Sequence, residues 1–260
     1  MKIAVIGAGN MGSAIAASLA GGADEVVCTA RSAATRARLE KELPGVKVTD
    51  DNAEAVKGAG MVVLGVKPYA AAEVIAGIRD SVAPGASIVS VVAELTVAEL
   101  RQAFRAEENQ LEVFRVIPNT AIRFGESATF IAHAPGCKGE SVAEIERVFN
   151  LSGRAFVVDE KEMAACTALA SCGIAFFLRF IRAAAEGATE LGLPPRFATE
   201  IAALTARGAA AVLSEGAHPE AEIDKVTTPG GLTIRGLNAM EAAGFTPSVI
   251  AALRACCPSS

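Results

Sequence analysis

A glycine-rich turn near the start of the chain has the spacing of a phosphate-binding loop. Gly7, Gly9 and Gly12 form a G-x-G-x-x-G pattern between an apolar run and a segment with helical spacing. Such glycines allow a tight turn, a close backbone approach to a pyrophosphate and contact between helix and strand, while the helix N-terminus attracts the phosphates. The pattern predicts a dinucleotide site, with a ligand-free turn as the alternative. The residues assigned to it are Gly7, Ala8, Gly9, Asn10, Met11 and Gly12.

The residues after the next predicted strand indicate whether the dinucleotide is NAD(H) or NADP(H). An NAD site usually carries Asp or Glu there, which accepts from the ribose 2′-OH and repels a 2′-phosphate. This chain instead has Arg31 and Ser32. Arg31 can pair with a phosphate through two parallel N–H bonds, and Ser32 can donate one more. The sequence therefore favours NADP(H), with NAD(H) as a possible second cofactor; the alternative is an exposed helix start whose arginine contacts nothing.

Two further segments lie where predicted strands end. Val66, Lys67 and Pro68 follow the fourth strand, and Asn119 follows the sixth. The carboxyl ends of parallel strands line the ligand crevice of such sheets, so these residues are candidates for cofactor binding. Taken alone, Lys67 is better explained as a surface charge. Asn119 can orient a nicotinamide amide or simply bond the backbone of its own turn.

A run of hydroxyl and glycine residues near the C-terminus is the last candidate site. Residues 227–233 read Thr-Thr-Pro-Gly-Gly-Leu-Thr and open a helical run. Exposed N–H groups and threonine side chains at such a helix start suit a small carboxylate, whereas an ordinary capped loop is the alternative. The candidate substrate-binding residues are Thr228, Gly230, Gly231, Leu232 and Thr233.

The elements that position these groups alternate between strand and helix over the first 160 residues. Apolar runs predict strands at residues 2–6, 25–29, 46–49, 61–66, 87–91 and 113–117. Helical spacing falls on residues 11–20, 32–43, 52–57, 70–79 and 96–104. Strands this apolar are buried on both faces, which predicts a doubly wound, Rossmann-type α/β domain with a parallel sheet. Residues 128–133 and 155–158 are expected as extra edge strands.

A second, all-helical domain is predicted for residues 161–260, after a dinucleotide-binding domain at 1–160. Its helices are broken at residues 192–195 and at Pro219. The segment 162–191 is apolar nearly all round, and such a helix must be buried on every side. The short helical remainder cannot surround it alone. We therefore infer a homodimer formed through the helical domain, with interdigitating helices.

Composition argues against several classes of partner. The 260 residues are 52% hydrophobic and 20% charged, with a net charge of −5 and no basic patch, so neither nucleic acid nor an anionic membrane is expected. The most apolar stretch, 163–178, ends short of the ~18 residues of a membrane span. Six cysteines without a C-x-x-C pair and two isolated histidines favour small apolar fillers over a metal site. Because the chain starts with a strand, we expect no signal peptide and a cytoplasmic protein.

Taken together, the motifs resemble the pyrroline-5-carboxylate reductase family along essentially the whole chain. The matching blocks are IGAGNMG at 6–12, VKP at 66–68, RVIPNT at 115–120, GLP at 192–194 and TTPGGLT at 227–233. The first block is shared by many dehydrogenases, whereas the last is specific. The resemblance implies NAD(P)H-dependent reduction of the C=N bond of 1-pyrroline-5-carboxylate to proline. It also implies a helical dimerisation domain and dimers that assemble into larger rings.

The resemblance further implies roles for single residues. The Thr233 hydroxyl would contact the ring nitrogen; we expect it to accept from the iminium N–H, because an unperturbed hydroxyl is too weak a general acid. Thr228 and the N–H groups around Leu232 and Thr233 would hold the substrate carboxylate. Residues 66–68 would lie beside the nicotinamide and Asn52 near the adenosine ribose. A protonated imine is already electrophilic, so positioning supplies most of the acceleration.

Three departures from the family pattern leave alternatives open. Ala170 removes a hydroxyl, Ile174 replaces a proline at a helix bend, and Glu94 stands in a run that is usually small and uncharged. A paralogue that reduces another cyclic imine, or a non-catalytic NADP(H) sensor, is compatible with them. A deazaflavin:NADP reductase or a 3-hydroxy-acid dehydrogenase is a further alternative. The latter needs a catalytic lysine in its helical domain, where this chain has only Lys161 before Lys225.

Overall fold

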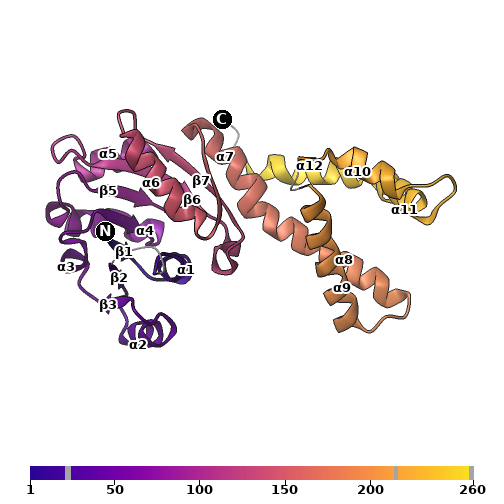
Figure 1. The fold of residues 1–260 in the computed structure, drawn as a ribbon, viewed down its shortest axis with the longest axis horizontal. Coiled ribbons are helices and arrows are strands. Elements are labelled where there is room, and N and C mark those ends of the chain that lie inside the picture. Colours follow the sequence, from indigo (N-terminus) through magenta and orange to yellow (C-terminus); the bar gives the residue numbers. More distant parts are fainter. Residues whose placement is uncertain (21–24, 214–215, 258–260) are drawn as a thin grey trace. The chain divides into compact units, whose positions relative to one another are not determined.

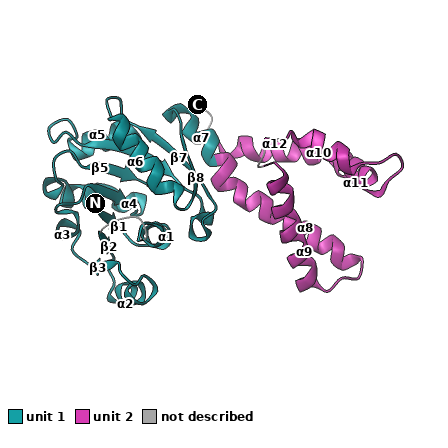
Figure 2. Ribbon diagram, viewed as in Figure 1, with its two compact units in different colours: residues 1–167 teal, residues 168–260 magenta. Residues whose placement is uncertain are grey.

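The computed structural model describes residues 1–20, 25–213 and 216–257 (Figure 1). The chain divides into two compact units, residues 1–167 and residues 168–260 (Figure 2). The first unit is built on a β-sheet, whereas the described part of the second unit is helical. The predicted fold class, a Rossmann-type sheet followed by a helical domain, is confirmed.

One sheet forms the centre of the first unit, with its strands in the order β3-β2-β1-β4-β5-β6-β7-β8. All neighbouring strands are parallel except β6 and β7. The strands are β1 (Lys2–Ile6), β2 (Glu25–Thr29), β3 (Lys47–Thr49), β4 (Met61–Leu64), β5 (Ser87–Ser90), β6 (Glu112–Ile117), β7 (Ser127–His133) and β8 (Gly153–Val157). Parallel pairing brings the carboxyl ends of β1, β2, β4, β5 and β6 to one edge, where the predicted cofactor residues begin.

Helices cover both faces of the sheet because side chains on each buried strand alternate between two cores. Ile3 and Val5 pack with α1, α2 and α6, whereas Ala4 and Ile6 pack with α3, α4 and α5. All four side chains are at most 1% exposed. The helices are α1 (Asn10–Leu19), α2 (Ala33–Glu42), α3 (Asn52–Val56), α4 (Pro68–Ile78), α5 (Val97–Phe104) and α6 (Gly139–Asn150). Burial on both faces explains why these strands read as almost unbroken apolar runs.

One prediction for the far side of the sheet is wrong. β7 is not an edge strand: it lies between β6 and β8, antiparallel to the first and parallel to the second. Helix α6, which the sequence analysis missed, makes the crossover that adds β8 outside it. Ser127 and Thr129 make β7 look half-exposed, but both are buried and their hydroxyls hydrogen-bond each other at 2.9 Å. Because the two hydroxyls hydrogen-bond each other, they can be buried on an inner strand.

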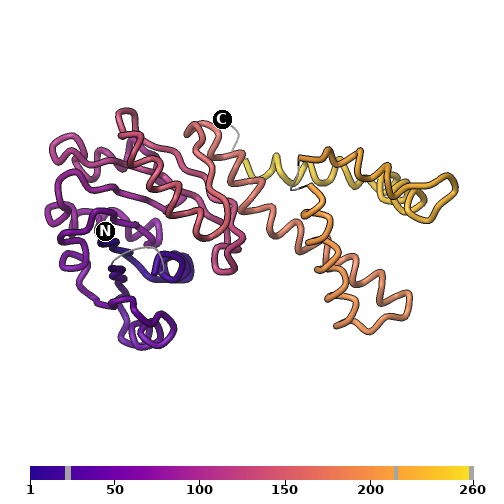
Figure 3. Tube along the Cα trace, viewed as in Figure 1, coloured from indigo at the N-terminus to yellow at the C-terminus, as the bar shows by residue number. Residues whose placement is uncertain are grey.

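The second unit contains five helices within its described residues (Figure 3). They are α8 (Gly173–Glu190), α9 (Pro195–Val212), α10 (Pro219–Val226), α11 (Leu232–Ala242) and α12 (Phe245–Cys256). A π-helical segment, Thr167–Cys172, precedes α8 and follows the short helix α7 (Met163–Cys166). Both predicted breaks are confirmed, because Gly192 has a φ of +98° and Pro195 and Pro219 each begin a helix. Proline suits the first helical position, where its missing N–H costs nothing.

The second unit buries almost no apolar side chain within one chain. Among its described residues, the buried hydrophobic ones are three alanines, Ala168, Ala185 and Ala198. In contrast, Phe177 on α8 and Leu204 on α9 are 67% and 61% exposed. Apolar burial is the main term that offsets the conformational entropy lost on folding. These helices therefore need a further apolar surface to cover them.

One helix in the described part of the chain, Glu160–Glu190, is long and apolar enough by length and composition to cross a membrane. It continues beyond residues 163–178, so the expectation that this region is too short for a span is wrong. Within the chain, 11% of its most apolar window is buried. The core helix of a soluble protein passes the same test, and one such helix is a weak indication of a membrane protein.

Candidate cofactor and substrate sites

The glycines of the β1–α1 turn are required by close backbone contacts. Gly7 has a φ of +91°, and a β-carbon there would lie 2.7 Å from Cγ1 of Val66. A β-carbon on Gly12 would overlap the carbonyl oxygen of Gly7. Gly65, directly after β4, is less tight, since its β-carbon would lie 3.2 Å from the same oxygen. The turn is therefore pressed against the end of β4, and neither Gly7 nor Gly12 can accept a side chain.

Gly9 differs from these glycines because it faces open space. A β-carbon on Gly9 would meet no atom within 4 Å. The helix α1 begins directly after it, with no side-chain cap and no acidic residue in its first turn. Free N–H groups and a positive helix end beside an open space suit an anion such as a pyrophosphate. The turn thus fits the dinucleotide that the sequence predicts.

Thr29, the last residue of β2, anchors the turn from the neighbouring strand. Its hydroxyl accepts a hydrogen bond from the N–H of Gly7 at 3.0 Å, and its carbonyl accepts one from Ala8 at 2.7 Å. The side chain is buried, with 2% of the residue exposed. Sequence reasoning missed this residue, although a threonine that ends a buried strand next to a glycine turn is a usable signal.

The two arginines after β2 differ in their contacts. Arg36 donates to the carbonyls of Ala30 and Arg31 at 3.0 and 2.8 Å, and it pairs with Asp50 at 3.0 Å. Arg31 is exposed, and its guanidinium has no hydrogen bond or ion pair to any described residue. The hydroxyl of Ser32 caps α2 by accepting from the N–H of Thr35 at 3.1 Å. The guanidinium of Arg31 therefore lies beside the capped start of α2 without a partner among the described residues. No Asp or Glu stands directly after β2, where an NAD site carries one.

The remaining candidates in the first unit lie at helix starts along the same edge. Asn52 is the first residue of α3, whose cap is Asp51, and it is half-buried. Lys67 precedes α4 at its N-cap position, makes no side-chain cap bond and is exposed, and Pro68 is the first residue of that helix. Val66 is half-buried, and its side chain faces Gly7. Gly7 and Val66 are therefore brought together, whereas contacts of Val66, Asn52, Lys67 and Pro68 with a cofactor stay predictions.

Asn119 has the contacts of a turn-forming residue. It is 5% exposed, and its side-chain oxygen accepts from the N–H of Ala121 at 2.9 Å at the start of a short 3-10 turn, Thr120–Phe124. Its own N–H donates to the hydroxyl of Ser127 at 3.1 Å. These bonds match the second of the two roles considered for it, bonding its own turn. A contact with the nicotinamide stays a prediction.

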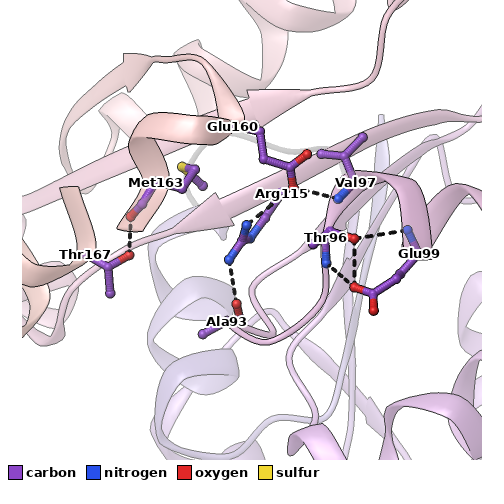
Figure 4. A network of polar contacts seen from close by, with 8 residues as sticks. All are labelled: Ala93, Thr96, Val97, Glu99, Arg115, Glu160, Met163 and Thr167. Atoms are coloured by element: carbon purple, nitrogen blue, oxygen red, sulfur yellow. Dashed lines mark hydrogen bonds and ion pairs between the residues drawn. The ribbon is translucent and has the colours of Figure 1, made fainter. Parts of the chain in front are cut away.

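A polar network that the sequence analysis missed holds the loop after β5 (Figure 4). Arg115 on β6 donates to the carbonyl of Ala93 at 2.7 Å and pairs with Glu160 at 3.3 Å. The same oxygen of Glu160 accepts from the N–H of Val97 at 2.8 Å, at the start of α5. A guanidinium that is 16% exposed and bonded on two sides is a rigid support. The network fixes the loop that carries the exposed Glu94.

In the second unit, the loop before α11 combines a tight turn with an open helix end. Gly230 has a φ of +70°, and the N–H of Gly231 donates to the carbonyl of Thr228 at 2.9 Å. A β-carbon on Gly231 would lie 2.5 Å from the Thr228 hydroxyl oxygen and 3.0 Å from the Thr228 carbonyl oxygen, so a side chain there would displace the Thr228 hydroxyl. The helix starts at Leu232 with no side-chain cap and no acidic residue in its first turn, and Thr233 is exposed. This end is suited to a small carboxylate.

The cysteines and histidines give no sign of a metal site. The part of the chain that the structure describes has no group of three His, Cys, Asp or Glu residues able to hold an ion. Burial raises the pKa of the Cys28 thiol to about 11, which keeps it protonated and unreactive inside the sheet.

Two family models match the chain. Residues 2–94 match the NADP oxidoreductase, coenzyme F420-dependent model, and residues 160–260 match the pyrroline-5-carboxylate reductase dimerisation model. Among solved structures, a pyrroline-5-carboxylate reductase from Coxiella burnetii is 26% identical with a TM-score of 0.89, over 98% of this chain and 95% of that one. The Plasmodium falciparum pyrroline carboxylate reductase with NADP bound shares the fold at 24% identity and a TM-score of 0.85, over 99% and 95%.

Curated relatives carry the same family name. Pyrroline-5-carboxylate reductase 1 of Dictyostelium discoideum is 39% identical over 95% of this chain, which spans about half, 47%, of that relative's length. Pyrroline-5-carboxylate reductase 2 of the same organism is 36% identical over 96% of this chain and 88% of its own length. The Arabidopsis thaliana enzyme is 31% identical over 97% and 91%. Since two of these relatives are at least 31% identical over most of their length, the chain belongs to the pyrroline-5-carboxylate reductase family.

Proposed function

We propose that this protein reduces the C=N bond of 1-pyrroline-5-carboxylate to give proline in proline biosynthesis. Family membership and the shared name of the relatives from amoeba and plant support the reaction. The observation that carries the proposal is the loop before α11, where two hydroxyls and an uncapped helix end meet. This loop has no His, Asp or Glu, and reduction of a protonated imine needs none of them.

In the proposed reaction, the residues of the loop before α11 bind the substrate carboxylate and orient the substrate ring. The reduced nicotinamide supplies the hydride. The free N–H groups of Leu232 and Thr233 and the hydroxyl of Thr228 bind the substrate carboxylate, because a helix N-terminus favours negative charge. The hydroxyl of Thr233 accepts from the iminium N–H, which orients the ring for attack. Holding the acceptor carbon in this way supplies most of the acceleration, since positioning alone removes a large part of a bimolecular barrier.

The proposed cofactor is NADP(H), within a family that uses NAD(P). The guanidinium of Arg31, which has no partner among the described residues, favours a 2′-phosphate at the end of β2. The Ser32 hydroxyl donates to the Thr35 hydroxyl at 2.7 Å and would join Arg31 by turning its proton to the phosphate. Gly9 and the first turn of α1 would hold the pyrophosphate, Asn52 the adenosine ribose, and Val66, Lys67 and Pro68 the nicotinamide. NAD(H) remains a second possible cofactor, because the phosphate turn is common to both dinucleotides.

The proposed assembly is a homodimer formed through the helical unit, with dimers joined into rings. The scarcity of buried side chains in that unit supports it, as does the match of residues 160–260 to a dimerisation model. Apolar cover from a second subunit also accounts for the apolar helix Glu160–Glu190 without a membrane. A cytoplasmic location and the absence of a nucleic-acid partner belong to the same proposal, and the net charge of −5 supports the latter.

The substrate loop is tested by replacing Thr233. Consumption of NADPH in the presence of 1-pyrroline-5-carboxylate should proceed with the unmodified protein and with Thr233→Ser. Thr233→Val should lose about 10- to 100-fold in kcat/KM, which corresponds to one hydrogen bond to a charged group. NADPH affinity, measured by fluorescence, should stay within about twofold because Thr233 has no role in binding the dinucleotide. Turnover only with other cyclic imines, or binding without turnover, would overturn the proposed reaction.

The phosphate turn is tested by two matched glycine changes. Gly9→Ala should leave the melting temperature unchanged, since its β-carbon meets nothing, yet weaken NADPH binding by filling the space over α1. Gly12→Ala should lower the melting temperature, because its β-carbon overlaps the Gly7 carbonyl. Calorimetry and NADPH titration on both variants separate the effects. Normal NADPH affinity in Gly9→Ala would mean that no phosphate approaches this turn.

The preference for the 2′-phosphate is tested at Arg31. Arg31→Gln should weaken NADPH binding by about 10- to 100-fold, the value of a charge-assisted hydrogen bond, and leave NADH affinity nearly unchanged. Arg38→Gln is the matched control, because Arg38 lies on α2, the helix that follows Arg31, and pairs with Glu42. If both nucleotides respond equally to Arg31→Gln, the arginine is a surface charge without a role in the choice.

The assembly is tested by charging the exposed apolar face. Leu204→Glu on α9 should shift the sedimentation coefficient toward that of a monomer and lower the melting temperature. Leu151→Glu introduces the same charge at a half-exposed leucine of the first unit and should change neither. A monomeric unmodified protein at micromolar concentration, or an unchanged assembly in Leu204→Glu, would contradict the proposed dimer.

A further inference from the structure

A cavity of about 280 Å³ lies in the first unit, away from the edge of the sheet that carries the cofactor candidates. Its wall is made by the end of α5, the start of β6 and the loop that joins β7 to α6. Because β7 is antiparallel to β6, the end of β7 lies beside the start of β6. The cavity is therefore at the amino end of β6, whereas Asn119 follows the carboxyl end of the same strand. The residues that line it are distinct from those of the sites described above.

Glu112, the first residue of β6, places a carboxylate in the wall of this cavity. Its side chain is 9% exposed, and its Oε2 atom has no hydrogen-bond partner among the described residues. Its Oε1 atom accepts from the backbone N–H of Lys138 at 3.3 Å, and the Lys138 ammonium lies 3.8 Å from the same oxygen, too far for a hydrogen bond. A carboxylate this deeply buried is costly unless cations and donors balance it. Glu112 is therefore able to accept from a further, positively charged donor.

Positive charge lines the same cavity at the start of α6. Lys138 is the N-cap residue of this helix, makes no side-chain cap bond and has a side chain that is 74% exposed. Gly136 lines the cavity with a φ of +88°, and a β-carbon on it would meet no atom within 4 Å. Glu140 lies in the first turn of α6 but does not line the cavity. N–H groups at a helix start and a lysine ammonium both attract a carboxylate.

The rest of the wall limits the size and the polarity of a ligand. Four apolar residues contribute to it: Ala106, Leu111, Ala134 and Pro135. Arg101 lines the cavity too, but its guanidinium is paired with Glu107 at 2.8 Å. Pockets for drug-sized ligands measure about 300–1,000 Å³, so this cavity suits a smaller molecule. The ligand that fits is small, has a short aliphatic part and carries one ammonium and one carboxylate group.

We propose that this cavity is a separate binding site for a free α-amino acid with a short aliphatic side chain. The ammonium of the ligand donates to Glu112, and its carboxylate accepts from the Lys138 ammonium and from N–H groups in the first turn of α6. A single carbon joins the two charged groups of an α-amino acid, so their partners must lie next to each other. Glu112 and Lys138 meet this condition, because the hydrogen bond from the Lys138 backbone joins them.

The proposal is tested by calorimetric titration of the full chain with L-valine, without nucleotide or 1-pyrroline-5-carboxylate. Valine should bind to one site in each chain. Isobutylamine and isovalerate keep its aliphatic part but lack the carboxylate and the ammonium, respectively, and each should bind at least about 10-fold more weakly. Equal binding of either analogue, or no binding of valine at millimolar concentration, would refute the proposal. Since no substrate of the proposed reaction is present, such a failure leaves that reaction untouched.

Matched variants locate the bound valine. Glu112→Gln keeps the shape of the side chain but removes its charge, and it should weaken valine binding by about 10-fold or more. Lys138→Met should weaken it too and, at an exposed position, tests the site even if Glu112→Gln disturbs folding. Glu108→Gln is the control, since Glu108 is exposed and does not line the cavity. Thr228→Val should leave valine affinity unchanged. Normal affinity in Glu112→Gln and Lys138→Met, or a loss in Thr228→Val, would place the ligand elsewhere and refute the proposal.

Discussion

The carbonyl oxygen of Gly7 lies so close to Gly12 that no β-carbon fits between them. This approach brings the start of α1 against β1 and, through Gly65, against the end of β4. Thr29 holds the same turn from β2 with two hydrogen bonds. Three strands and one helix are thus joined at a point that contains almost no side-chain volume. The free N–H groups of α1 are fixed there over the carboxyl edge of the sheet, where a ligand can reach them.

Two kinds of glycine serve this turn for different reasons. Gly7 and Gly12 are required by the protein's own backbone, so their replacement damages the fold whether or not a ligand binds. Gly9 has an ordinary φ of −72° and open space around its missing side chain. Nothing in the protein alone demands glycine at position 9. The unfilled space is itself the feature that fits a pyrophosphate, since a side chain would keep the phosphates away from the helix end.

The sequence predicted those parts of the molecule that depend on local patterns. Strand positions, the glycine turn, the helix breaks at Gly192 and Pro219 and the helical second half all follow from periodicity or from backbone limits of single residues. Contacts between distant parts of the chain could not be predicted from such patterns. The Arg115–Glu160 pair joins residues far apart in the sequence. The inner position of β7 depends on the crossover that later adds β8 beside it. Burial alternates along β7, so its local pattern could not distinguish an edge strand from an inner one.

Within the candidate sites too, the sequence could not predict which of two nearby arginines makes contacts with the rest of the protein. The sequence analysis assigned the 2′-phosphate to Arg31 but could not predict the contacts of Arg36, the next arginine along the chain. In the structure, Arg36 bonds to two carbonyls and pairs with Asp50, whereas the guanidinium of Arg31 has no partner among the described residues. The carboxylate at Asp50 neutralises the bound arginine, which leaves the local positive charge on the uncommitted one.

The different contacts of Arg31 and Arg36 affect the free energy with which Arg31 could bind a phosphate. A mobile arginine loses side-chain entropy when it binds a phosphate, which lowers the net gain. Arg36 reduces this cost for its neighbour, because it holds the backbone of Ala30 and Arg31 in place through their carbonyls. The loop is then ordered before any nucleotide arrives, and what remains to be ordered is the side chain of Arg31. If Arg31 binds a 2′-phosphate, as we propose, the loop that presents it is already ordered by Arg36 through the carbonyls of Ala30 and Arg31.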